Sequence, residues 1–359
     1  MPKVPKHQES LTAVEERHFG GEVLGAESAT PMPNRECSNS NCTSGHSMSS
    51  DAPDAPPAHA CAPHKPLRRS DHLRKPDWLK ISLRSTTDTA EVEQIVEGRC
   101  LHTICTSGMC PNKAECWSRR TATFMILGDI CTRNCRFCAT LSGRPLPPDQ
   151  DEPEKVAESV RLMGLKHAVV TSVTRDDLPD HGAAIWARTV EAIRRENPET
   201  TIELLISDMD ARPELIDVVL ASRPDIVGHN IETVERLTPE VRSRAKYRTS
   251  LATLRHIADS GAVAKSGLMV GLGESEEEVL TTLRDLREAG VSIVTLGQYL
   301  RPTKEHYPVK DYITPQKFEE YRLKALEMGF CYCASAPLVR SSYLADAALD
   351  AVRKVCKKE

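Results

Sequence analysis

Residues 121–138 read TATFMILGDICTRNCRFC, and this stretch decides the fold class. Its apolar part, Thr123–Leu127, is short and followed by Gly128, as is typical of a buried strand. Three cysteines, Cys131, Cys135 and Cys138, come directly after it. Functional residues of parallel α/β proteins gather at the carboxyl ends of the strands. The stretch therefore predicts a strand that leads into a functional loop.

Similar apolar runs recur downstream and alternate with amphipathic stretches typical of helices. The further strand candidates are Ala168–Val173, Ile202–Ile206, Ile226–Val227, Gly267–Val270 and Ile293–Leu296. The helix candidates are Pro153–Met163, Ala183–Glu196, Pro213–Ser222, Ser250–Ser260, Glu276–Ala289 and Pro315–Met328. The pattern predicts an α/β protein, a partial (β/α)6 TIM-like barrel with N-terminal and C-terminal extensions covering the site. An open doubly wound sheet is the alternative.

The chain of 359 residues divides by composition. We expect a disordered extension rich in Pro, Ser and Ala over residues 1–76, which carry 10 of the 24 prolines and one aromatic residue. An N-terminal extension with cysteines would follow over 77–120, the barrel over 121–300 and a C-terminal segment over 301–359. We expect a cytoplasmic protein; the alternative is a mitochondrial or plastid location, if the acidic first segment is a transit peptide.

Charge and hydropathy narrow the function classes. The net charge is -4 and no run of about 18 apolar residues occurs, so we expect neither a nucleic-acid partner nor a membrane partner. The 13 cysteines are the informative residues, because six of them lie between Cys105 and Cys138. No apolar signal-peptide core opens the chain, so a reducing compartment and metal or redox chemistry are expected.

The cysteines form two groups with different spacing. Cys131, Cys135 and Cys138 (C-x3-C-x2-C) can hold three corners of an iron–sulfur cluster and leave one iron open. A zinc site with a distant fourth ligand, or thiols that are close by chance, are the alternatives. The second group (C-x4-C-x5-C) fits structural zinc or a second cluster. This second group consists of Cys105, Cys110 and Cys116. The identity of its fourth ligand is open, and the candidates are Cys100, Cys331, Cys333 and an oxygen atom.

With both motifs in view, the sequence from about Lys75 to Tyr343 resembles the lipoyl synthases, a family of radical S-adenosylmethionine enzymes. The C-x3-C-x2-C motif marks the superfamily, whereas C-x4-C-x5-C together with Arg340–Tyr343 is specific to the family. The other matching segments are Thr121–Gly128, Thr171–Leu178, Gly228–Thr233, Lys265–Glu274 and Gly297–Leu300.

The resemblance implies two 4Fe–4S clusters and S-adenosylmethionine as cofactors. The first cluster would bind S-adenosylmethionine and be held by Cys131, Cys135 and Cys138. The second, auxiliary cluster would have a serine hydroxyl as its fourth ligand, which we place on Ser342 with Ser341 as the alternative. A hard oxygen ligand holds iron less firmly than a thiolate. The three thiol ligands of the auxiliary cluster would be Cys105, Cys110 and Cys116.

The resemblance also suggests residues that bind S-adenosylmethionine, each with a structural alternative. The segment with Gly271, Gly273 and Glu274 would lie along the adenosine, or form only a turn between strand and helix. Asp176 and Asn230 would contact the cofactor, or belong to loops that cap helices. Lys265 would pair with the cofactor carboxylate, or with a buried carboxylate of the protein.

The family reaction inserts sulfur at carbons 6 and 8 of an octanoyl chain on a lysine of a lipoyl carrier domain. These carbons have no acidity that a side-chain base could use, so a cofactor must supply the chemistry. The auxiliary cluster would donate the sulfur, which requires both clusters to face one cavity. The implied partners are octanoylated 2-oxoacid dehydrogenase acyltransferase subunits, the glycine cleavage H protein, and a reductant such as ferredoxin or flavodoxin.

Two other functions stay open at this point. One is a different radical S-adenosylmethionine enzyme that inserts sulfur, such as one that methylthiolates RNA. The other is an iron–sulfur or zinc-binding protein without catalytic activity.

Overall fold

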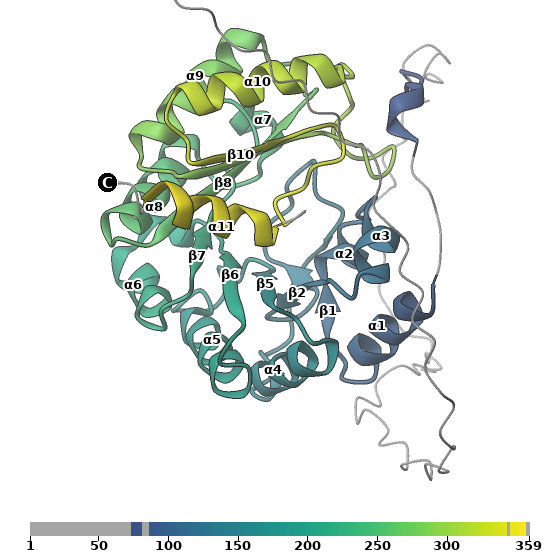
Figure 1. The fold of residues 1–359 in the computed structure, drawn as a ribbon, viewed down its shortest axis with the longest axis vertical. Coiled ribbons are helices and arrows are strands. Elements are labelled where there is room, and N and C mark those ends of the chain that lie inside the picture. The colour runs from purple at the N-terminus through teal and green to yellow at the C-terminus, as the bar shows by residue number, and fades with distance from the viewer. Residues whose placement is uncertain (1–72, 81–85, 343–344, 357–359) are drawn as a thin grey trace, which may run out of the picture. The chain divides into compact units, whose positions relative to one another are not determined.

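A curved sheet of eight strands organises the chain (Figure 1). The structure, a computed structural model, describes residues 73–80, 86–342 and 345–356. The strand order is β1-β2-β5-β6-β7-β8-β9-β10, with all neighbours parallel except β1 and β2. The bounds are β1 His102–Thr103, β2 Thr123–Ile126, β5 His167–Ser172, β6 Thr201–Leu205, β7 Ile226–Gly228, β8 Val263–Val270, β9 Ile293–Gln298 and β10 Tyr332–Ser335. A separate small parallel pair joins β3 (Ile130–Cys131) to β4 (Leu141–Ser142).

Helices connect the parallel strands and lie along one face of the sheet (Figure 1). These are α4 Glu152–Met163, α5 Ala183–Glu196, α6 Pro213–Ala221, α8 Tyr247–Asp259, α9 Glu276–Glu288 and α10 Pro315–Glu327. The N-terminal extension contributes α1 Thr87–Glu97, α2 Ile104–Ser107 and α3 Lys113–Ser118. The remaining helices are α7 Thr238–Val241, α11 Ala345–Cys356 and the short 3-10 helices Asp77–Leu79, Met209–Ala211 and Glu235–Leu237.

The predicted α/β fold is confirmed. All six predicted strands are present, as β2 and β5 to β9, and the predicted helices match to within about a turn. Four strands were not predicted: the short pair β3 and β4, and two strands of the large sheet. β10 extends the sheet parallel to β9, and the two-residue β1 pairs antiparallel with β2. Within the described residues, β1 and β10 are the edges of this sheet. The division into four segments stays a prediction, and residues 1–72 lie outside the described residues.

Local sequence signals explain where the helices begin and end. Pro153 lies in the first turn of α4, and Gly164 ends it with a left-handed φ of 64°. At α9, Ser275 and Glu278 form a capping box, in which each side chain accepts a hydrogen bond from the other residue's backbone N–H. The helices bury their apolar faces against the strands. In one core cluster, for example, Val156 and Ile193 of the helices join strand residues such as Phe124.

A short segment shows that the sheet is curved into a partial barrel. The carbonyl oxygen of Val339 lies 2.2 Å from where a Cβ of Gly297 in β9 would be, and the Ser342 hydroxyl contacts Thr123 in β2. In a flat sheet β2 and β9 would be about 24 Å apart, at about 4.8 Å per strand. Four residues span at most about 11 Å between their terminal Cα atoms. Residues 339–342 therefore cross the inside of a curved sheet.

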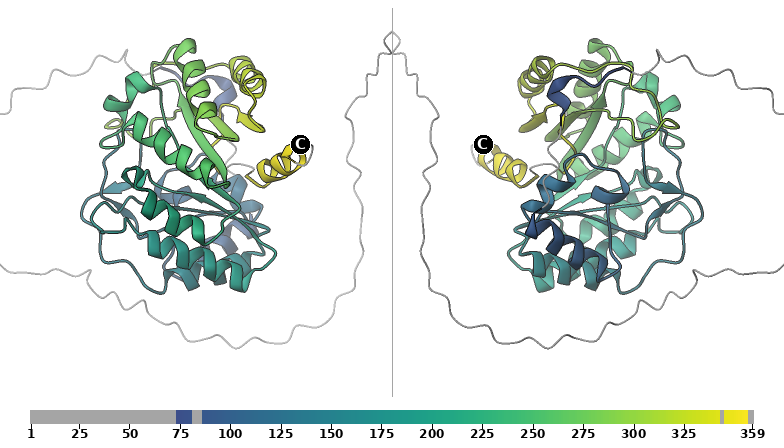
Figure 2. Two further views of the ribbon diagram at one scale, coloured as in Figure 1. Left: turned by 90° about the vertical axis from the view of Figure 1, so that its left-hand side faces the viewer. Right: turned by 90° about the vertical axis from the view of Figure 1, so that its right-hand side faces the viewer.

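The C-terminal helix α11 packs at the amino ends of the central strands. Its residues Ala348, Leu349 and Val352 share a core cluster with Ile226 and Ile293, which begin β7 and β9. Figure 2 shows α11 apart from the helices that cover the sheet. Among the described helices, none combines the length and the apolar character needed to cross a membrane.

Candidate functional site

The loop that follows β2 holds the first group of cysteines. Cys131 ends β3, and its Sγ accepts hydrogen bonds from the backbone N–H groups of Arg133 (3.4 Å) and Thr174 (3.3 Å). Such donors stabilise a thiolate and tune a cluster bound to it. His306 Nε2 donates to the carbonyl oxygen of Cys138 (2.9 Å), which ties the end of the loop to the segment after β9. The three cysteines therefore lie in one anchored segment that follows β2.

A buried arginine inside this loop fixes it to the sheet. The Arg133 guanidinium donates two hydrogen bonds of 2.8 Å to Asp176 and one of 2.9 Å to Asp208. Burial raises the pKa of Asp208, but the hydrogen bond from Arg133 and nearby charges lower it to about 2. Asp176 follows β5 and Asp208 follows β6, so one side chain joins the cysteine loop to two strand ends. Sequence reasoning placed Asp176 on the cofactor; the structure shows both its oxygens bound to Arg133.

The glycine segment after β8 forms a tight turn. Gly271 and Gly273 have φ values of 95° and 108°, which favour glycine. A Cβ on Gly271 would lie 2.2 Å from Gln298 Nε2, so no larger residue fits. The Glu274 carboxylate folds back and accepts from the N–H groups of Gly271 (2.5 Å) and Leu272 (2.9 Å). The segment lies at the carboxyl end of β8, where the parallel fold places functional residues.

Two other predicted cofactor residues contact protein groups. Lys265 Nζ donates to Glu203 Oε1 (2.6 Å), and both side chains are buried. This contact corresponds to the structural alternative for Lys265. Asn230 follows β7, and its amide donates to the Ser341 hydroxyl (3.0 Å). Asn230 thus contacts the C-terminal motif, a connection that sequence analysis did not anticipate.

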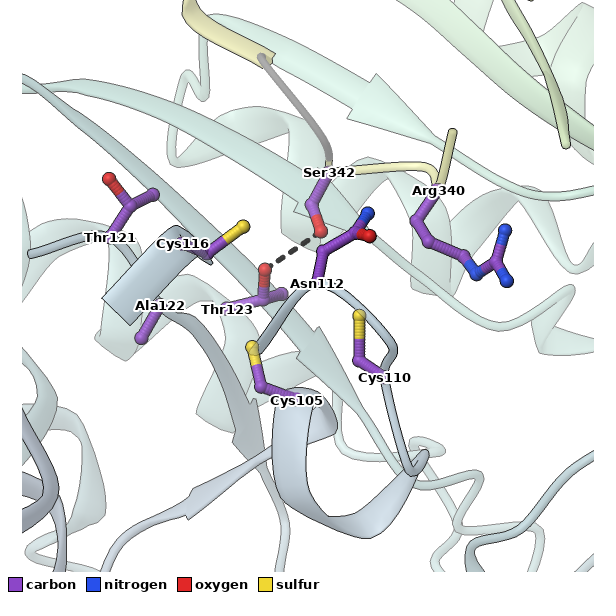
Figure 3. A pocket seen from close by; sticks show the side chains of 9 residues that line it. All are labelled: Cys105, Cys110, Asn112, Cys116, Thr121, Ala122, Thr123, Arg340 and Ser342. Carbon is purple, nitrogen blue, oxygen red and sulfur yellow. Dashed lines mark hydrogen bonds between the residues drawn. The ribbon is translucent and has the colours of Figure 1, made fainter. Parts of the chain in front are cut away.

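The second group of cysteines lines a cavity with the C-terminal motif. Its walls include Arg340 and Ser342. The Ser342 hydroxyl accepts a hydrogen bond from Thr123 Oγ1 (2.9 Å). Ser341 is not part of the wall, because its hydroxyl is held by Asn230. The three thiols of the cavity are those of Cys105, Cys110 and Cys116 (Figure 3).

The electrostatics of this cavity suit a metal cluster bound by thiolates. Burial and the neighbouring thiols of Cys105 and Cys110 raise the pKa of Cys116 to about 12. Three thiolates would therefore repel one another unless a metal compensated their charge. Burial lowers the pKa of Arg340, and the Cys110 thiolate is the charged group that opposes this shift. Among the described residues, no carboxylate pairs with Arg340. Three thiols, one hydroxyl and an unpaired cation fit a thiolate-bound cluster with net negative charge.

Comparisons with known proteins agree with these motifs. Residues 125–286 match the Radical SAM superfamily. The chain is 58% identical over 277 residues to the lipoyl synthase of Parabacteroides distasonis, covering 77% of this chain and 99% of the relative. It is 59% identical over 278 residues to that of Porphyromonas gingivalis, with 77% and 99% covered. The chain belongs to the lipoyl synthase family.

As a lipoyl synthase family member, the chain is a radical S-adenosylmethionine enzyme of the sulfur-inserting type. The superfamily implies one 4Fe–4S cluster and S-adenosylmethionine. The alternatives of an RNA-modifying enzyme and of a non-catalytic metal protein are set aside. Among solved structures, similarity is found to methylornithine synthase (13% identity, TM-score 0.47, 69% of this chain and 70% of that one). A maturase of the [FeFe]-hydrogenase is similar too (13%, TM-score 0.47, 67% and 61%).

Four residues that shape the sites were not predicted as ligands or cofactor contacts. Thr123 contacts Ser342, Arg133 contacts Cys131 and His306 contacts Cys138. Asp208 acts through Arg133, from which it accepts a hydrogen bond. Thr123 and Arg133 carry a sequence signal because they lie within the stretch of residues 121–138. Asp208 carries one because it follows the strand predicted over Ile202–Ile206, and polar residues at such strand ends are expected near the site. His306 comes from a distant loop and is brought in by the fold.

Proposed function

We propose that this enzyme inserts two sulfur atoms, at carbons 6 and 8, into an octanoyl group on a lysine of a lipoyl carrier domain. One observation carries the proposal: three cysteines and Ser342 line one cavity, while three other cysteines occupy a separate loop after β2. A single-cluster enzyme has no need of the second set. We also propose a cytoplasmic location, and as partners octanoylated acyltransferase subunits or H protein and a ferredoxin or flavodoxin.

The two sets of ligands would hold two 4Fe–4S clusters. Cys131, Cys135 and Cys138 would bind the cluster that chelates S-adenosylmethionine. The three thiols of the cavity and Ser342 would bind the auxiliary cluster. When bound, these groups supply a 5′-deoxyadenosyl radical that removes hydrogen from an unactivated carbon, and sulfide that replaces it.

The contacts of the chain suggest how its residues serve this chemistry. The N–H groups of Arg133 and Thr174 would stabilise the Cys131 thiolate, and Arg133 would keep the loop in place through Asp176 and Asp208. The turn from Gly271 to Glu274 presents backbone at a strand end, where an adenosine could lie against it.

The C-terminal motif would connect the two sites. Arg340 offsets negative charge beside Cys110, while Asn230 holds Ser341 away from the cavity. These contacts favour Ser342 over Ser341 as the oxygen ligand. Because residues 339–342 cross the inside of the curved sheet, the cavity lies against the lumen and not on the outer helical face. This placement supports one shared reaction chamber.

The test is anaerobic reconstitution with iron and sulfide, followed by incubation with S-adenosylmethionine, a reductant and an octanoyl-lysine peptide. We expect about eight irons per chain and a peptide that has gained two sulfur atoms by mass spectrometry. Cys110→Ala should abolish sulfur insertion while 5′-deoxyadenosine still forms. Cys333→Ala, which removes a buried thiol of β10, is the matched control and should insert sulfur normally. Sulfur insertion by Cys110→Ala at the wild-type rate would refute the proposal.

A further inference from the structure

Thr123 is a buried residue that neither the motif analysis nor the proposed ligand set assigns. It is the first residue of β2, its side chain lies in the wall of the auxiliary cavity, and it is 5% exposed. Its hydroxyl donates to Ser342 Oγ at 2.9 Å, and Figure 3 shows the two hydroxyl oxygens facing each other. The proposed oxygen ligand therefore has a defined hydrogen-bond donor from the sheet.

Among the described residues, the bond from Thr123 is the one that reaches the Ser342 hydroxyl. Asn112, between two cysteines of the cavity, donates to the carbonyl oxygen of Leu338 (2.8 Å), and Asn230 donates to Ser341 (3.0 Å). These two bonds hold the segment on either side of Arg340, one through a backbone carbonyl and one through a side-chain hydroxyl. Neither one sets the rotamer of the Ser342 side chain, which a single χ1 rotation can turn away from the cavity.

A neighbouring threonine provides a contrast within the same cavity. Thr121 also lines it, but its hydroxyl donates to the carbonyl oxygen of Arg119 (3.2 Å) and is thus bound to its own loop. Of the two threonine hydroxyls in the wall, Thr123 is the one bonded to Ser342. This difference makes Thr121 a matched control.

We propose that Thr123 is a positioning residue of the auxiliary site, whose hydroxyl holds Ser342 Oγ toward the iron and donates a hydrogen bond to it in the bound state. The inference rests on the proposed function of Ser342 as a ligand. A hydrogen bond to an oxygen that carries negative charge is stronger than one between neutral groups, so iron binding would strengthen this contact. Groups that hydrogen-bond to metal ligands orient them and tune their hold on the metal. Ser342 would then be held in place but remain displaceable.

The experiment compares the reconstituted full-length enzyme with Thr123→Val, Thr123→Ser and Thr121→Val. Valine keeps the β-branched shape of a strand residue and removes only the hydroxyl. The primary readout is the Mössbauer spectrum of protein loaded with isotope-enriched iron, in which an oxygen-ligated iron differs from its thiolate-ligated neighbours. We expect Thr123→Val to change that one component and to slow sulfur insertion about tenfold. 5′-Deoxyadenosine formation should stay at the wild-type rate.

Thr123→Ser, which restores a hydroxyl, should recover the wild-type spectrum and rate, and Thr121→Val should resemble the wild type. A wild-type spectrum in Thr123→Val would overturn the inference. So would a Thr123→Ser variant as defective as Thr123→Val, because packing and not the hydroxyl would then be responsible. If the wild type inserts no sulfur but the spectrum still changes in Thr123→Val, the proposed function fails while the role of Thr123 stands.

Discussion

Replacing Arg133 with methionine should destabilise the fold strongly, although the residue lies in a loop. Its side chain is 5% exposed and forms ion pairs with the carboxylates of Asp176 and Asp208, which are 8% and 1% exposed. Removing one partner of a buried ion pair costs about 3–5 kcal/mol, because a buried charge is left uncompensated. Asp208 then loses its arginine partner, whereas Asp176 keeps Arg244 at 3.5 Å. We therefore expect a loss of about 3–5 kcal/mol, a large part of the roughly 5–15 kcal/mol that stabilises a typical domain.

The assay is urea denaturation of the full chain without iron, followed by circular dichroism. Arg136→Met is the control from the same loop, because Arg136 is 51% exposed and lies 3.6 Å from the exposed Glu240. It should cost less than about 1 kcal/mol. Adding Asp176→Asn and Asp208→Asn to Arg133→Met should recover most of the loss. If Arg133→Met costs no more than Arg136→Met, the two carboxylates do not depend on Arg133 and the reasoning is wrong.

Three further predictions concern other buried groups. Lys265→Met should lower the free energy of unfolding by about 3–5 kcal/mol, because it removes the lysine from the buried Glu203 and leaves only His167, at 3.5 Å, beside that carboxylate. Adding Glu203→Gln should restore the free energy of unfolding. A loss of S-adenosylmethionine binding in this double variant, measured by equilibrium dialysis, would instead favour a cofactor role. Burial lowers the pKa of His229 from 6.5 to about 4, so the free energy of unfolding should fall as pH drops through this range, by about 3 kcal/mol in total. His229→Gln should make the free energy of unfolding less dependent on pH. A wild-type urea midpoint that is constant between pH 7 and 4 would contradict this prediction. Gly297→Ala should displace Val339, because its carbonyl oxygen lies 2.2 Å from where the new Cβ would be. Sulfur insertion should then slow while 5′-deoxyadenosine formation continues. Insertion at the wild-type rate would show that residues 339–342 tolerate the displacement.

The strands and helices of the barrel could be predicted because their apolar periodicity is local. β10 lacks that signal, since Tyr332–Ser335 alternates small, polar and aromatic residues. It becomes a strand by pairing with β9 along four residues. β1 is only two residues long and depends on its pairing with β2. Both are examples of tertiary context deciding a segment whose own propensity is weak.

The residues of the candidate site also differ in how far the sequence predicts them. Cysteine spacing is visible in the sequence, but hydrogen-bond partners are not. Arg133 meets Asp176 across 43 positions and Thr123 meets Ser342 across 219. For Lys265, the sequence left a choice between two carboxylates, and only the register of β8 beside β7 and β6 brings Glu203 into reach. Which polar groups meet inside a barrel depends on strand order, which no local pattern contains.

The cavity that Ser342 completes also has a consequence for biosynthesis. Its thiols come from residues 105–116, whereas its hydroxyl and its cation come from residues 340–342. During translation the loop with Cys131, Cys135 and Cys138 emerges from the ribosome some 200 residues ahead of Ser342. If the proposed ligand sets hold iron, iron delivered to the nascent chain would find the first set complete and the second lacking its oxygen donor, so the two proposed centres would mature in that order.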